Sequence, residues 1–82
     1  MNRDALDAAI RSQFAAEAAW RYAETGEEWI PMHVFRFVDL ATLHAVEKAT
    51  GMRARAEGNG TYGTYVLDYG GCVFQAARKE AD

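Results

Sequence analysis

The chain has 82 residues, nine Lys and Arg against twelve Asp and Glu, and a formal net charge of −3. As a compact monomer of this size it exposes about 4,900 Å², so we expect one domain over residues 1–82 with a thin core. Half of the residues are hydrophobic, which excludes the composition of a disordered tail. The apolar runs are too short to cross a bilayer, and no signal peptide follows Met1, so we expect a cytoplasmic protein without membrane association.

The first quarter of the chain has the composition of a helix. Residues 5–23 are rich in alanine and contain neither Gly nor Pro. Asn2 or Asp4 can cap the start of this helix, and Gly26 suits the left-handed residue that follows its end. The apolar arc is wide and consists mostly of small side chains, which indicates that the helix packs across a sheet and keeps a face for a partner.

Residues 29–38 are dense in aromatic and β-branched side chains, which predicts a strand. Pro31 restricts the start of this strand to a sheet edge or an entry position. Alternation places Val34 on one side of the strand and Phe35 and Phe37 on the other. We expect the aromatic side to be the inner face.

A second helix and three strands are predicted in the rest of the chain. Asp39 is predicted to cap the start of the helix, and Gly51 is predicted to end it. Two hairpin signals, Asn59-Gly60 and Gly70-Gly71, then separate antiparallel strands near residues 52–57, 61–69 and 72–78. The core side of the middle strand carries Tyr65, Leu67 and Tyr69. The order α-β-α-β-β-β predicts an α+β fold, a four-stranded mostly antiparallel sheet with helices packed on one face.

Catalytic and metal chemistry find little support in the sequence. The single cysteine, Cys72, excludes an internal disulfide, and neither His33 nor His44 is predicted on the same element as this thiol. His44 and Glu47 share a helix face, but two ligands do not make a metal site. The glycines of residues 58–63 lead into a strand pattern, which favours a turn over a phosphate loop. We therefore predict no enzyme, no catalytic residue, no metal and no cofactor.

A nucleic-acid-binding sheet is an alternative. Arg53 and Arg55 alternate onto one strand face, and the next strand carries Tyr62, Tyr65 and Tyr69. Arginines and exposed aromatic side chains on a sheet can stack single-stranded bases. Because the chain is acidic and has two lysines, it lacks the basic stripe that phosphate binding needs. Direct nucleic-acid binding is therefore the less favoured function.

Acidic side chains gather in the first third of the chain. Residues 1–30 contain six Asp and Glu against three Arg, a net charge of −3. An acidic end on a small rigid domain can compete for the basic groove of another protein.

In size, charge and α+β pattern, the chain resembles the small inhibitors that phages and mobile elements encode, among them anti-CRISPR proteins. This resemblance implies a non-enzymatic inhibitor that binds a CRISPR effector subunit with a basic surface and blocks target DNA binding or nuclease recruitment. The resemblance assigns no functional role to any individual residue of this chain. From their charge and aromatic character we predict the partner-binding residues Glu24, Glu27, Glu28, Trp29, Arg53 and Arg55. Acids suit a lysine-rich DNA channel, and an adjacent aromatic residue supplies an apolar anchor.

Three other functions remain open on the sequence. The first is a nucleic-acid-binding module that uses Arg53, Arg55 and the tyrosine-bearing sheet. The second is a homo-oligomeric accessory protein whose sheet edge or first helix pairs with its copy, so we expect a monomer or a homodimer. The third is a small enzyme, which would need a pocket with perturbed ionisable groups.

Overall fold

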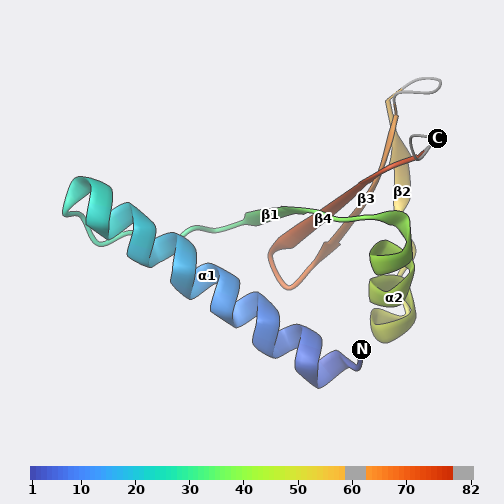
Figure 1. Cartoon of the computed structure of the whole chain (residues 1–82), viewed down its shortest axis with the longest axis horizontal. Coiled ribbons are helices and arrows are strands. Elements are labelled where there is room, and N and C mark those ends of the chain that lie inside the picture. The colour runs from blue at the N-terminus through green and yellow to red at the C-terminus, as the bar shows by residue number, and fades with distance from the viewer. Residues whose placement is uncertain (59–62, 79–82) are drawn as a thin grey trace.

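The computed structural model describes residues 1–58 and 63–78. Its elements are α1 (Arg3–Thr25), β1 (Val34–Phe37), α2 (Leu40–Thr50), β2 (Arg55–Glu57), β3 (Thr64–Tyr69) and β4 (Cys72–Ala77) (Figure 1). The predicted α+β class and the order α-β-α-β-β-β are confirmed. The predicted Asn59-Gly60 turn lies outside the described residues, as do residues 79–82.

The four strands form one mixed sheet in the order β1-β4-β3-β2. β3 pairs antiparallel with both β2 and β4, whereas β1 runs parallel to β4. The sheet is therefore mostly antiparallel, as predicted. The parallel pair is possible because α2, β2 and β3 lie between β1 and β4 in the sequence and return the chain to the same end of the sheet. α2 contacts β3 and β4, and α1 contacts β1 and α2; that both helices pack on one face stays a prediction.

Both helices begin and end where their capping residues predict. The Asn2 carboxamide oxygen accepts a hydrogen bond from the backbone N–H of Ala5 at 2.8 Å. The Asp39 carboxylate likewise accepts from the backbone N–H of Thr42 at 2.7 Å. Each helix ends on a left-handed glycine whose N–H bonds to the last turn. Such local hydrogen bonds satisfy helix ends without help from the rest of the fold.

One hydrophobic core joins the helices to the sheet. Its buried members are Leu6, Ile10, Val34, Leu43, Val46, Leu67, Cys72, Phe74 and Ala76. Leu67 is fully buried, and Tyr65 and Tyr69 pack against the cluster, so the predicted core side of β3 is confirmed. β4 contributes three buried residues because it is a central strand with a neighbour on each side.

The prediction for the inner face of β1 is wrong. Val34 is buried at 3% exposure, whereas Phe35 and Phe37 are 67% and 68% exposed. The strand is apolar on both sides, so alternation alone does not decide which side faces the core. Its register against β4 decides, because Val34 pairs with buried Cys72 and points to the same side of the sheet. The strand is also shorter than predicted, since residues 29–33 lie outside it and include a bend at Met32.

The second half of α1 extends beyond the sheet. The start of the helix is anchored by Tyr69, whose hydroxyl donates to the Asp7 carboxylate at 2.7 Å and accepts from Arg3 Nε at 2.9 Å. Only Leu6 and Ile10 of the helix are buried. Beyond Phe14 the helix projects away from the body, and the chain returns beside it to β1 (Figure 1). We call residues 15–33 the arm.

The turn between β3 and β4 gives a test of the packing. Gly70 and Gly71 have φ of 60° and 83°, and a Cβ on Gly71 would lie 2.7 Å from the ring of Phe14. We expect Gly71→Ala to destabilise the fold by more than the roughly 1–3 kcal/mol of an unfavourable backbone conformation, because the ring must also move. The matched control is Gly51→Ala, where φ is 72° and no atom lies within 4 Å. Thermal unfolding with equal losses for both variants would contradict this packing of α1.

Candidate protein-binding surface

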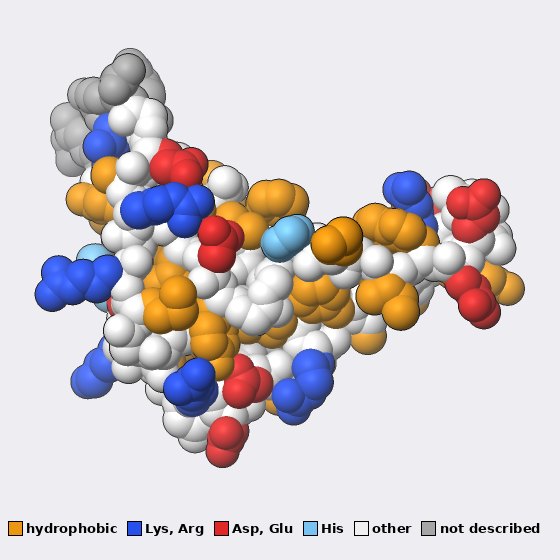
Figure 2. All heavy atoms as spheres, turned by 180° about the vertical axis from the view of Figure 1, so that it is seen from behind, with side chains coloured by type: hydrophobic (Ala, Val, Ile, Leu, Met, Phe, Trp, Pro, Cys, Tyr) orange, Lys and Arg blue, Asp and Glu red, His pale blue; other side chains and the backbone are white. Residues whose placement is uncertain are grey.

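Large hydrophobic side chains are exposed along the arm and on β1. On the arm they are Trp20, Tyr22, Trp29, Ile30 and Met32, and on β1 they are Phe35 and Phe37. Ile30 is 79% and Met32 83% exposed. Figure 2 shows hydrophobic side chains that continue from the body of the molecule onto the arm. A concentration of exposed apolar side chains of this kind marks an interaction surface.

A groove runs along the arm between α1 and the segment that returns to β1. It has a volume of about 790 Å³ and is lined by Ala18, Ala19, Tyr22, Glu28, Trp29 and Ile30. We call it the arm groove. The guanidinium carbon of Arg21 lies 4.7 Å from the centre of the Trp29 ring, a cation–π contact that holds the indole at the wall of the groove. Trp29 remains 45% exposed, so a partner can still contact it.

Carboxylates gather at the end of the arm. Glu28 lines the arm groove, whereas Glu24 is exposed in the last turn of α1 and Glu27 in the segment that follows the helix. Acidic side chains are visible at the end of the arm in Figure 2. The nearby positive charge, Arg21, is held against Trp29. The structure thus brings together four of the predicted partner-binding residues, the three glutamates and Trp29, at one end of the molecule. We call these four residues the acidic tip.

The two predicted arginines lie elsewhere. Arg55 is on β2 and Arg53 precedes it, at the opposite end of the long axis from the tip of the arm (Figure 1). Arg55 forms ion pairs with Glu57 at 2.9 Å and with Asp68 at 3.2 Å. These carboxylates raise the pKa of Arg55 and neutralise its charge locally. Arg53 and Arg55 therefore do not share a surface with the acidic tip.

The tyrosines of the predicted nucleic-acid surface also lie apart from Arg55. Arg55 pairs with Val66 of β3, and adjacent residues of a strand point to opposite faces. Tyr65 accordingly packs with the core, as does Tyr69. Tyr62 is outside the described residues. Among the described residues, Arg55 therefore does not share a sheet face with Tyr65 or Tyr69, and the predicted stacking platform does not form.

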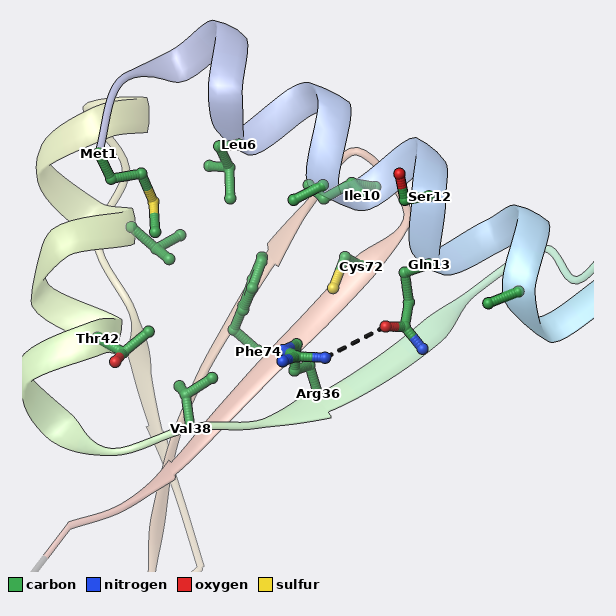
Figure 3. Close-up of a pocket in the computed structure, with 13 residues that line it drawn as sticks. Met1, Leu6, Ile10, Ser12, Gln13, Arg36, Val38, Thr42, Cys72 and Phe74 are labelled. Atoms are coloured by element: carbon green, nitrogen blue, oxygen red, sulfur yellow. Dashed lines mark hydrogen bonds between the residues drawn. The ribbon is translucent and has the colours of Figure 1, made fainter.

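A second groove lies between α1, α2 and the sheet, with a volume of about 560 Å³ (Figure 3). Leu6, Ile10 and Phe74 give it apolar walls. At its rim the Arg36 guanidinium donates a hydrogen bond to the Gln13 carboxamide oxygen at 3.2 Å. Cys72 lies at its floor and is 2% exposed. Burial raises the pKa of the Cys72 thiol, against a smaller opposite effect of Arg36, so the thiol is protonated and a poor nucleophile at neutral pH.

His44 and Glu47 have a structural role in the observed geometry. The Glu47 carboxylate contacts His44 Nδ1 at 2.8 Å and accepts a hydrogen bond from the backbone N–H of Ala54 at 2.9 Å. The pKa of Glu47 is lowered, chiefly by the hydrogen bond from the backbone of Ala54 and next by the contact with His44. The pair thereby fastens α2 to the segment before β2. Across residues 1–58 and 63–78 no group of three or more His, Cys, Asp or Glu side chains is placed to hold a metal ion.

Sequence reasoning missed part of the surface. Trp20 and Tyr22 fall in the apolar arc of the first helix, yet both are exposed on the arm. The signal that could have identified them is their size, because large aromatic side chains follow a stretch where alanine dominates. In the described part of the chain, no helix is long and apolar enough to cross a membrane.

Comparison with known proteins gives no relative. No protein family, no curated protein and no solved structure matches this chain. Its function must therefore be argued from the geometry and charge of its own surface.

The environment of Cys72 predicts its reactivity. Because the thiol is buried and its pKa is raised, modification by a disulfide reagent at pH 8 should be slow and limited by unfolding. The raised pKa favours the protonated folded state, so stability should fall as pH rises above about 8.5, where the unfolded thiol ionises. Cys72→Ala, which cannot ionise, should lose this alkaline decline. Rapid modification of the native protein would contradict the burial of Cys72.

Proposed function

We propose that the protein is a non-enzymatic protein-binding module that docks on a basic surface of its partner through the tip of the arm. The observation that carries this proposal is the arm groove, which half-exposed Trp29 and Glu28 line together, at the end of the arm where Glu24 and Glu27 are also exposed. Interfaces commonly combine a central aromatic anchor with a polar rim.

The charges and the aromatic residue have different parts in this binding. Carboxylates at the tip attract a basic surface and accelerate encounter, which raises the association rate. Trp29 then inserts its exposed edge and loses contact with water, which slows dissociation. The cation–π contact with Arg21 holds the indole in place before binding, so less conformational entropy is lost when the partner docks.

The specific form of the proposal follows the resemblance to anti-CRISPR proteins. In this form the basic surface is the DNA channel or nuclease-docking face of a CRISPR effector subunit, and the arm blocks it. Three exposed carboxylates at one end of an acidic chain support this proposal, because they can take the place of DNA phosphates. The distance of Arg53 and Arg55 from the tip leaves them outside the proposed interface.

Binding kinetics with a purified CRISPR effector complex test the proposal. Glu27→Lys with Glu28→Lys should reduce the association rate by about tenfold at low salt. The difference should shrink as salt is raised, because the screening length falls from about 10 Å at 0.1 M to about 3 Å at 1 M. Trp29→Ala should chiefly raise the dissociation rate.

Two control variants distinguish binding through the tip from an effect of net charge and from binding through the opposite end of the molecule. Asp4→Lys with Glu17→Lys changes the net charge equally at exposed positions of α1 outside the tip, and should have a much smaller effect. Arg53→Glu with Arg55→Glu tests the opposite end and should leave association intact. An equal loss in the Asp4 and Glu17 pair would show that net charge alone matters. If no effector complex binds, the specific form is wrong, and the same variants then test the tip against a partner purified from the native host.

A further inference from the structure

One edge of β1 is open and carries exposed phenylalanines. β1 pairs with β4 alone among the described strands. The backbone N–H of Val34 donates a hydrogen bond to the carbonyl oxygen of Gly71 at 3.0 Å, and the N–H of Val38 donates one to the carbonyl oxygen of Gln75 at 2.8 Å. Because backbone groups alternate along a strand, those of Phe35 and Phe37 point to the opposite, open edge. An exposed apolar edge is a template for pairing with another strand.

The chain exposes more surface than a compact monomer of its mass. The protein exposes 5933 Å², whereas a compact monomer of this mass exposes about 4,900 Å². The excess of about 1,000 Å², to which the arm and the open β1 edge both contribute, is no smaller than the roughly 800 Å² that each partner buries in a stable interface of standard size. The radius of gyration, 14.3 Å, likewise exceeds the about 12 Å of a compact domain of this length.

We propose that a second copy of the chain covers this edge, with the two β1 strands antiparallel across a twofold axis. The two sheets then join into one of eight strands. A strand edge is self-complementary under twofold symmetry, because the same backbone groups on each copy are donor and acceptor to the other. This surface is separate from the arm tip, so the proposal goes beyond the proposed function and does not depend on it.

The side chains select one register. With the axis at Phe35, the Phe35 residues of the two copies face each other and Arg36 lies opposite Val34 of the other copy. With the axis at Arg36, the two guanidinium groups would face each other, and like charges in opposite positions destabilise a sheet. The first register places the two Phe35 rings and the two Phe37 rings in one cluster on the outer face of the joined sheet.

Further apolar area follows from this arrangement. In an antiparallel pair the residues before one β1 run beside the residues after the other. Met32, the most exposed large hydrophobic side chain among those described, therefore comes next to the other copy.

The mass of the protein in solution tests the proposal. Light scattering should give twice the 9.1 kDa of the chain at protomer concentrations near 100 μM, which detects dimers with a Kd tighter than that. Phe35→Lys with Phe37→Lys should give the mass of one chain with an unchanged circular dichroism spectrum. If this variant fails to fold, Phe35→Thr with Phe37→Thr replaces the rings by β-branched residues that favour a strand and should weaken the dimer at least tenfold.

The matched control changes aromatic residues that are exposed elsewhere. Trp20→Lys with Trp29→Lys alters the arm and should leave the mass at twice that of the chain. A wild-type protein that stays a monomer at this concentration would overturn the proposal. A dimer that persists in the phenylalanine variants would also overturn it. The same holds if only the arm variant has the mass of a single chain. Loss of partner binding in the arm variant with an intact dimer would leave this proposal standing, so its failure and that of the proposed function are distinguishable.

Discussion

The register of β1 against β4 determines which side chains of this protein face the core and which face outward. With Val34 opposite Cys72 and Phe35 opposite Val73, the valine is buried and the two phenylalanines are exposed. A shift by one residue would exchange the two sets, because successive side chains of a strand alternate between faces. The exposed rings and the open edge of β1 both follow from its pairing with β4.

The arm is the other large surface that the core leaves uncovered. Its helix is held to the body by Leu6 and Ile10 and by the Tyr69 contacts with Arg3 and Asp7, all in the first half of α1. A helical segment as short as the remaining half is marginal on its own in water. Its exposed aromatic side chains are then best explained by contact with another macromolecule. The tip of the arm lies away from β1 in the fold (Figure 1), so the acidic tip and the apolar strand edge can serve different partners.

Local signals made the helices predictable, whereas the orientation of β1 depends on contacts between distant residues. Asn2, Asp39 and the two left-handed glycines act within a few residues of themselves, so the sequence alone indicates the ends of the helices. The Gly70-Gly71 turn is local in the same way. By contrast, residues 34–38 are apolar on both sides, and only pairing with β4, more than thirty residues away, shows which side is buried. For this reason the sequence could predict the glutamates and Trp29 of the candidate site, but it could not predict that Phe35 and Phe37 are exposed.

Hydrogen exchange at individual backbone amides of β1 tests the central claim most directly, because it reports both the register and the occupation of the open edge. The amides of Val34 and Val38 bond to β4 and should be protected at every protein concentration. Those of Phe35 and Phe37 should exchange rapidly in dilute protein and become protected as the concentration rises. Protection of Phe35 and Phe37 in dilute protein, with rapid exchange at Val34 and Val38, would show that β1 pairs in the other register and would contradict this account.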